Sequence, residues 1–327
     1  METVRLGIAG PGRIVHRVMK DLRKAEHIEI AAVAARNLER AQAAAAEYGI
    51  PSAFGSYEEM ATSNAVDLVY VAVPHPFHCA LSRLFLQNGK HVIVEKPFAL
   101  NAKEAWEMIN CAKASNRFLM EAMWSRFFPA AQSLKALIDS DVLGDIRLIT
   151  ADFAFQAPIN YEDRLFNRRL GGGSLLDVGV YPLSLICFYK SELPNRVQVL
   201  YDKNETDVDV VCSFQIQFAG GAVGQGFSAL DVTTDQRMKI FGTEAWVDLS
   251  DFWHPTRYIV HRPGMALEVN EFALEDEGFH HEFEYAAKAI LAGQTDQNVI
   301  SLAESLHIME IMDGMREQMG VSYSGEE

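Results

Sequence analysis

The chain has 327 residues, enough for two domains of ordinary size, and its 49% hydrophobic and 22% charged residues exclude disordered and fibrous classes. Its formal net charge of −15, from 29 basic and 44 acidic residues, argues against nucleic-acid binding and against anionic membrane surfaces. No apolar run approaches the ~18 residues that cross a membrane. The start of the chain lacks a signal-peptide pattern, and the four cysteines follow no disulfide or zinc spacing. We therefore expect a reduced cytoplasmic protein that holds no metal.

The first part of the chain alternates between short apolar runs and helical periodicity. Asn37, the pair Ser56 and Glu59, and the pair Asn101 and Glu104 resemble helix-capping residues. Strands are predicted at 4–9, 28–35, 66–73, 91–95 and 118–121, and helices at 14–23, 38–48, 76–88 and 101–116, with a short helix after Ser56. Strands that are apolar on both sides and separated by helices predict a doubly wound parallel sheet of the α/β class.

The pattern changes after residue 121. Helices are predicted at 129–140, 174–188, 279–291 and 301–319, and strands at 146–155 and repeatedly between 197 and 272, with a hairpin at 219–221. Successive strands without intervening helices predict a large, mainly antiparallel open sheet. We expect a dinucleotide-binding domain over 1–121 and a substrate-binding and dimerisation domain over 122–327.

A glycine-rich turn follows the first strand. Gly10 and Gly12 would permit a tight turn and the close approach of a pyrophosphate, with Arg13 and Ile14 opening the next helix. The alternative is a simple glycine turn between strand and helix. The second strand ends without the Asp or Glu that bonds the ribose of NAD, whereas Arg36 could pair with a 2′-phosphate, so NADP is expected rather than NAD.

Further candidates follow the later strands of the same sheet. Pro74, His75 and His78 come after the third long strand, at the edge where dinucleotides bind, although either histidine could be structural. Glu95 and Lys96 end the next strand. A metal role for the two histidines is discounted because no acidic or cysteine ligand lies nearby in sequence.

In the second part of the chain, a triple-glycine segment precedes an apolar helix. Asp177 and Tyr181 are spaced to share one helix face. A tyrosine hydroxyl can act as a general acid or base when a nearby cation, such as Lys96, lowers its pKa. The alternative is a core tyrosine and a capping carboxylate.

Together these motifs resemble the Gfo/Idh/MocA oxidoreductase family over essentially the whole chain. The segments that carry the resemblance are 7–14, 32–36, 95–97 and 171–181. Segments 56–59, 120–129 and 252–256 are most similar to its dimeric dihydrodiol dehydrogenase and NADP-dependent D-xylose dehydrogenase branch. The resemblance implies a Rossmann domain followed by an open-sheet domain, with Lys96 and Tyr181 catalytic and Asp177 in the site.

The substrate pocket is harder to predict. Trp124, Phe153 and Trp253 could form an apolar or sugar-stacking wall, or could equally belong to the core. Arg126 and Arg164 could contact substrate or cofactor, or lie on the surface.

We therefore expect an NADP-dependent enzyme that transfers a hydride between nicotinamide and a hydroxyl or carbonyl group of a sugar, polyol or cyclic diol. Two alternatives stay open: an NAD-dependent glycosidase of the same fold, and a non-catalytic nucleotide-sensing regulator.

The strand predicted over 208–218 suggests how copies of the chain associate. Its even-numbered residues form an apolar face, whereas Asp209, Val211, Ser213, Gln215 and Gln217 form a semi-polar face. A partner copy could cover that second face, so a homodimer or a dimer of dimers is expected.

Overall fold

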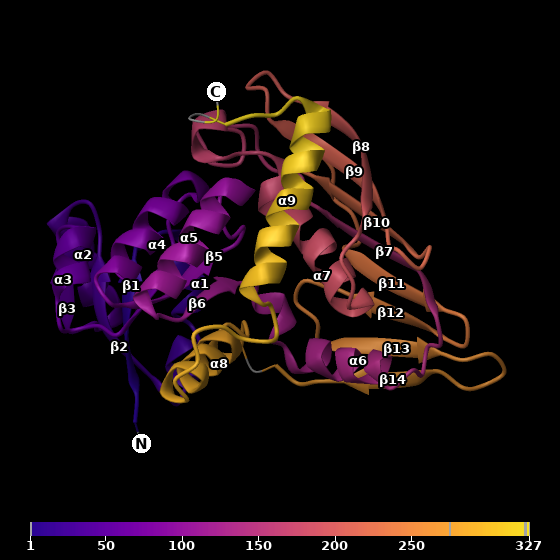
Figure 1. Cartoon of the computed structure of the whole chain (residues 1–327), viewed down its shortest axis with the longest axis horizontal. Helices are drawn as coiled ribbons and strands as arrows, with labels where there is room; N and C mark the ends of the chain where they lie inside the picture. Colours follow the sequence, from indigo (N-terminus) through magenta and orange to yellow (C-terminus); the bar gives the residue numbers. More distant parts are fainter. Residues whose placement is uncertain (1, 275, 324–325, 327) are drawn as a thin grey trace. The chain divides into compact units, whose positions relative to one another are not determined.

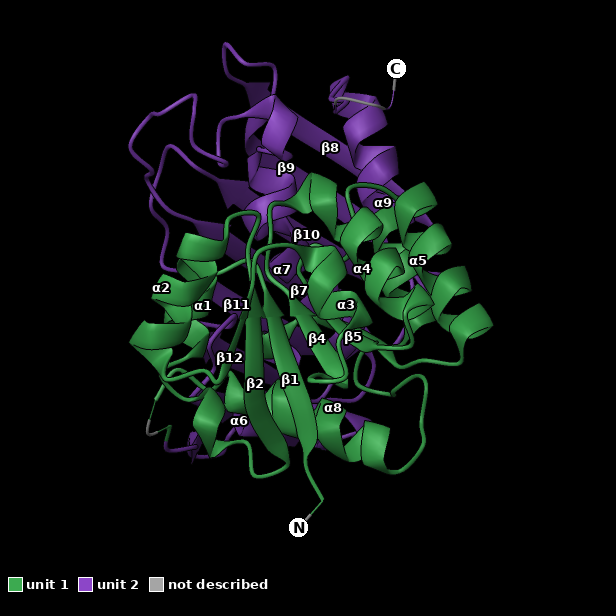
Figure 2. Ribbon diagram, turned by 90° about the vertical axis from the view of Figure 1, so that its left-hand side faces the viewer, with its two compact units in different colours: residues 1–124, 274–309 green, residues 125–273, 310–327 purple. Residues whose placement is uncertain are grey.

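The computed structural model describes residues 2–274, 276–323 and 326 and contains two compact units. Unit 1 comprises residues 1–124 and 274–309, and unit 2 comprises residues 125–273 and 310–327 (Figure 2). Unit 1 is therefore built from two separate stretches of the chain, which differs from a single boundary after residue 121.

Unit 1 contains a parallel six-stranded sheet. Its strand order is β3-β2-β1-β4-β5-β6, the order of doubly wound dinucleotide-binding folds. The strands are β1 (Val4–Ala9), β2 (Ile28–Ala34), β3 (Ser52–Phe54), β4 (Leu68–Val71), β5 (His91–Glu95) and β6 (Leu119–Ala122). Every residue of β4 and β6 is buried, as expected for strands covered on both faces. The predicted α/β class is confirmed; the three-residue β3 was not predicted, since it has no apolar run of its own.

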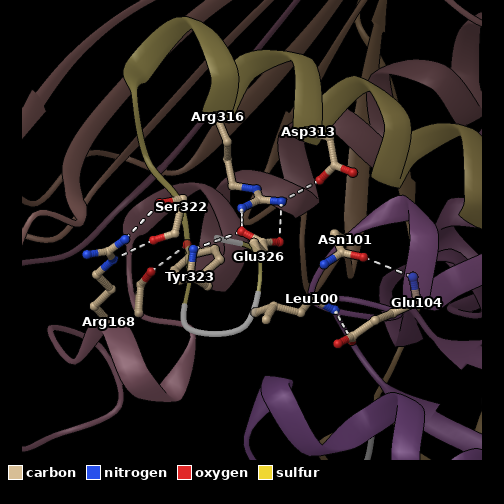
Figure 3. A network of polar contacts seen from close by, with 10 residues as sticks. Leu100, Asn101, Glu104, Arg168, Asp313, Arg316, Ser322, Tyr323 and Glu326 are labelled. Carbon is tan, nitrogen blue, oxygen red and sulfur yellow. Dashed lines mark hydrogen bonds and ion pairs between the residues drawn. The ribbon is translucent and has the colours of Figure 1, made fainter.

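Three helices of this unit begin at the capping residues that the sequence predicted. The side chain of Asn37 accepts a hydrogen bond from Arg40 N (3.2 Å), and that of Asn101 accepts one from Glu104 N (2.9 Å; Figure 3). Ser56 caps the short helix through Glu59 N at 3.1 Å. The helices are α1 (Arg13–Val18), α2 (Leu38–Tyr48), α3 (Tyr57–Thr62), α4 (His78–Gln87), α5 (Ala102–Ser115) and α8 (His280–Leu291).

The first helix is shorter than the predicted 14–23. It ends at Val18, and a separate 3₁₀ turn follows at Leu22–Lys24. Between them, the carboxylate of Asp21 accepts a hydrogen bond from Gly278 N at 2.5 Å and lies 3.4 Å from His280 Nδ1. The chain turns here to meet a segment more than 250 residues later, which local periodicity could not indicate.

Residues 274–309 are held in unit 1 by side chains of α8 and of the loop before it. Glu284 accepts hydrogen bonds from the backbone (3.0 Å) and ring (2.6 Å) of His27, and Arg17 pairs with Glu277 at 2.7 Å. The rings of Tyr70 and Phe283 meet edge to face at 5.1 Å. These contacts explain why a C-terminal segment joins the N-terminal sheet.

Unit 2 contains an eight-stranded sheet in the order β14-β13-β12-β11-β7-β10-β9-β8 (Figure 1). Only β7 and β10 pair in parallel among its described strands; the other neighbours are antiparallel, as predicted. The strands are β7 (Ile146–Ala154), β8 (Arg196–Lys203), β9 (Asp209–Gln217), β10 (Val223–Ala229), β11 (Arg237–Gly242), β12 (Trp246–Ser250), β13 (Arg257–His261) and β14 (Glu268–Glu271).

One face of this sheet is covered by helices. After α6 (Pro129–Asp139), a π-helical turn (Leu175–Gly179) leads into α7 (Val180–Lys190), which packs on β7 and β10. By length and composition the stretch Arg168–Lys190 could cross a membrane, but 94% of its apolar window is buried inside the structure, as in a core helix. The chain passes from unit 1 into unit 2 within α9 (Leu302–Met319).

Candidate active site

In unit 1, the two glycines of the turn between β1 and α1 have different surroundings. Gly10 has a φ of +92°, and a Cβ atom there would lie 2.7 Å from Val73 Cγ1 and 2.9 Å from the Ala72 carbonyl oxygen. A Cβ on Gly12 would meet nothing closer than 3.8 Å. Gly10 is therefore required by the fold, whereas at Gly12 a side chain would meet its neighbours only at ordinary contact distance, so the fold alone does not require glycine there and the close approach of a pyrophosphate would.

Arginines gather next to this turn. Arg36 and Arg40 are exposed where β2 passes into α2, and Arg40 joins Pro11, Gly12 and His16 around a pocket of about 130 Å³. Burial raises the pKa of Tyr57, while the charges of Arg36 and Arg40 act to lower it, so the three groups lie near one another. Tyr57 was missed by sequence reasoning, although its place directly after the helix cap Ser56 was visible. Arg13 is exposed and Ile14 half-buried on the first turn of α1.

The ends of β4 and β5 carry the remaining cofactor candidates of unit 1. His78 is fully buried, with Nδ1 3.0 Å from the Pro97 carbonyl oxygen and Nε2 2.9 Å from that of Val73, and burial lowers its pKa to about 4. These contacts tie together the loops that follow the two strands. Next to them, Pro74 and Lys96 are half-buried, and His75 is buried, with its ring 5.7 Å from that of His78. Glu95 accepts a hydrogen bond from the hydroxyl of Tyr70.

In unit 2, the structure brings four of the predicted residues into two contacting pairs. Asp177 lies in the π-helical turn, 4% exposed, and its carboxylate pairs with Arg164 at 2.6 Å. Tyr181 lies in the first turn of α7, and its ring centroid is 5.3 Å from that of Phe153.

Trp253 extends the aromatic surface beside Tyr181. Its ring stacks on Phe153 at 5.1 Å, and its Nε1 donates to Gln236 Oε1 at 2.8 Å. A π-helical turn is a rare element that is frequent at functional sites. The arrangement combines a tyrosine hydroxyl, a paired carboxylate and an aromatic wall, which suits proton transfer to or from an oxygen of a ring-shaped substrate.

Two predicted pocket residues are placed in the core of their units. Arg126 is fully buried; it donates to Ser184 Oγ (3.1 Å) and Ser184 O (2.6 Å) and lies over the ring of Phe188. Trp124 is 4% exposed and stacks on Phe279 at 4.1 Å. These contacts account for both positions, and substrate contact by either residue stays a prediction.

Asp209 does not lie where strand alternation predicted. Instead of facing outward with Val211 and Ser213, it is fully buried, because its side chain accepts hydrogen bonds from Ser174 Oγ and Leu175 N. The triple-glycine segment before Ser174 and the strand over 208–218 were both recognised in the sequence, but the contact between Asp209 and residues 174–175 was not.

Comparisons with known proteins agree with this geometry. Residues 4–123 match the model of an oxidoreductase family with an NAD-binding Rossmann fold, and residues 131–248 match the GFO/IDH/MocA C-terminal domain. The chain belongs to the GFO/IDH/MocA oxidoreductase family. The resemblance inferred from the sequence motifs is thus confirmed.

Known proteins resemble the chain over nearly its full length. It is 35% identical to trans-1,2-dihydrobenzene-1,2-diol dehydrogenase from Danio rerio, over 98% of both chains. The crystal structure of aldose-aldose oxidoreductase from Caulobacter crescentus, complexed with glycerol, has a TM-score of 0.88 and 24% identity over 98% of both chains. A 3-ketoreductase from Actinomadura kijaniata, in complex with NADP and TDP-benzene, has a TM-score of 0.85 and 22% identity over 97% of this chain and 98% of that one. The two structures support the fold alone.

Proposed function

We propose that this chain is an NADP-dependent dehydrogenase that transfers a hydride between nicotinamide and a hydroxyl or carbonyl group of a cyclic diol, sugar or polyol. The observation that carries the proposal is Tyr181, held in the first turn of α7 with its ring 5.3 Å from that of Phe153. The dehydrogenase activity named for relatives at 35% identity, over 98% of the chain, supports the same reaction class. The free cysteines suit a reducing cytoplasm.

The residues of unit 1 fit the cofactor. The backbone at Gly12 would receive the pyrophosphate, Arg13 and Ile14 would border it, and Arg36 would pair with the 2′-phosphate. Pro74, His75, His78 and Glu95 would shape the loops beyond the strand ends. When bound, the nicotinamide would accept or supply the hydride.

The chain's own residues would handle the proton and the charge. Tyr181 would take the proton from the substrate hydroxyl during oxidation and return one during reduction. Lys96 is suited to stabilise negative charge on an oxygen. Asp177, fixed by Arg164 at 2.6 Å, would orient the polar groups around the tyrosine, while Phe153 and Trp253 would contact the apolar face of the substrate ring.

An absorbance assay of NADPH formation with aldoses, inositols and trans-dihydrodiols tests this function. We expect formation of NADPH with at least one of these classes and much weaker activity with NAD⁺. Hydrolysis of glycosides without net reduction of the cofactor would identify a glycosidase. Cofactor binding without turnover of any member of the panel would identify a nucleotide sensor.

We also propose that two copies associate through the uncovered face of the eight-stranded sheet. Leu200 on β8 is 78% exposed, and its register partner is Ser213 on β9. Gln215, two residues further along β9, is also exposed. An exposed leucine on this semi-polar surface suits burial against a second copy. Light scattering at micromolar concentration should give a dimer or larger, and a particle of 36.5 kDa would contradict the proposal.

A further inference from the structure

A buried carboxylate supports the segment that carries Asp177 and Tyr181. Asp209, the first residue of β9, is 0% exposed. Its Oδ2 accepts hydrogen bonds from Ser174 Oγ at 2.8 Å and from Leu175 N at 2.7 Å. Leu175 opens the π-helical turn, so the carboxylate bonds to an amide at the start of the helical stretch 175–190. A negative charge is favourable at this end of a helix.

Gly173, just before this turn, has no side chain and so leaves room for the carboxylate of Asp209. Gly173 has a φ of +119°, and a Cβ atom there would lie 2.3 Å from Asp209 Oδ1. Any larger residue would push the carboxylate away from Ser174 and Leu175. The third glycine of the triple-glycine segment therefore has a specific partner in β9.

The other side of the same segment is fastened to the end of the chain. The hydroxyl of Tyr323 donates to the Gly172 carbonyl oxygen at 2.7 Å, and the guanidinium of Arg168 bonds to Ser322 O at 2.6 Å and Ser322 Oγ at 2.7 Å (Figure 3). The glycine segment is thus held between β9 and the C-terminal residues. Of these side chains, Asp209 is the one that bonds directly to the π-helical turn, at Leu175 N.

Stability alone does not explain an acid at this position. Among the described residues, Asp209 Oδ1 has no hydrogen-bond partner, and burial raises the pKa of Asp209 to about 6. A buried carboxylate with one unsatisfied oxygen costs stability relative to an apolar side chain of similar size. Features that break a folding rule in this way tend to occur at functional sites.

We propose that Asp209 is a positioning residue, which fixes the π-helical turn through Leu175 N and Ser174 Oγ and so sets the places of Asp177 and Tyr181. The inference rests on the proposed function, in which Tyr181 moves the proton. Asp209 acts only through the backbone of the turn. A misplacement of about 1 Å at a reacting group can cost ~100-fold in rate.

The test compares Asp209→Asn and Asp209→Ala with wild type in kcat, KM and NADP affinity. Asn keeps the shape and one acceptor for Leu175 N, so we expect kcat to fall by roughly 10-fold in Asp209→Asn and further in Asp209→Ala, with NADP affinity unchanged. The matched control is Asn204→Ala, which removes the acceptor for Val208 N (3.3 Å) in the turn before β9. It should lower thermal stability and leave kcat unchanged.

A double-mutant cycle separates positioning from general damage. In a Tyr181→Phe background, Asp209→Asn should cause little further loss of kcat, because both changes act on the same step. Full additivity would overturn the proposal, as would wild-type kcat in a folded Asp209→Asn. If Asp209→Asn does not fold, Ser174→Ala carries the test: a fall in kcat supports the proposal, and an unchanged kcat overturns it. A fully active Tyr181→Phe would instead contradict the proposed function.

Discussion

At the scale of single residues, Tyr181 is the side chain on which the proposed proton transfer depends. Tyr181→Phe removes the hydroxyl and keeps the ring that packs against Phe153 at 5.3 Å. We expect kcat to fall by ~10²–10⁴-fold, the usual contribution of general acid–base catalysis. NADP affinity, measured by calorimetry, should not change. Near wild-type turnover would assign the proton to another residue, with His75 the next candidate, because both ring nitrogens of His78 face backbone carbonyl oxygens.

Arg36 decides the cofactor prediction. Arg36→Ala should weaken NADP binding by roughly 10-fold or more, since a charge-assisted hydrogen bond contributes about 1.5–3 kcal/mol. NAD⁺ lacks the 2′-phosphate, so its affinity should stay the same. Arg262→Ala, which removes an arginine from the hairpin of β13 and β14, serves as the control in titration calorimetry. Equal weakening for both cofactors, or none for NADP, would reject the assignment of Arg36.

Residues with a chemical signature could be predicted from the sequence, and residues defined by distant contacts could not. Asp177 and Tyr181 follow a glycine segment that is visible in the chain, whereas alternation along β9 placed Asp209 on the wrong side of the sheet. The register of β8 and β9 shifts between Asp202 and Lys203, directly opposite the start of β9. The buried position of Arg126 could not be predicted for the same reason, because its hydrogen-bond partner Ser184 is 58 residues away in the sequence.

At the scale of elements, local signals predicted helix starts and helix ends to within about two residues, apart from the end of the first helix. Asn37, Ser56 and Asn101 cap the helices that they were expected to cap. Periodicity also predicted five of the six parallel strands. The three-residue β3 lacks such a pattern, and the predicted 14–23 helix is interrupted where Asp21 bonds to Gly278.

The β1–α1 turn offers two glycines whose substitution should affect stability differently. Gly10→Ala places a Cβ atom 2.7 Å from Val73 Cγ1 at a φ of +92°, so thermal stability and NADP binding should both fall. Gly12→Ala places one 3.8 Å from the Ala72 carbonyl oxygen, an ordinary contact distance, so the fold should be retained while NADP affinity drops. Thermal melts and cofactor titration measure both effects. Unchanged NADP affinity in a folded Gly12→Ala would show that the pyrophosphate does not use this space.

At the scale of the whole molecule, the return of residues 274–309 to unit 1 is the feature that sequence reasoning missed. The amphipathic pattern of α8 predicted a helix but not the sheet on which it packs. Contacts with residues far away in the sequence hold the segment in unit 1, among them those of Glu284 with His27 and of Phe283 with Tyr70. It also brings a buried acid, Glu282, into the core of unit 1.

Glu282 should make the stability of this protein depend on pH. It is 1% exposed, neither of its carboxylate oxygens has a partner among the described residues, and burial, with the nearby charges of Glu95 and Asp21, raises its pKa well above the usual range. The folded state therefore keeps a proton that the unfolded chain releases above about pH 4.3. Because the unfolded state binds fewer protons there, this group makes stability fall as pH rises.

Glu282→Gln keeps the size of the neutral acid and removes the titration. We expect the variant to match wild type near pH 4 and to melt at a progressively higher temperature than wild type as pH rises towards 8. Thermal unfolding followed across this range measures the difference. Glu317→Gln, which changes an exposed carboxylate, should shift the melting curve little at any pH. A constant difference between Glu282→Gln and wild type from pH 4 to 8 would mean that Glu282 titrates alike in the folded and unfolded states.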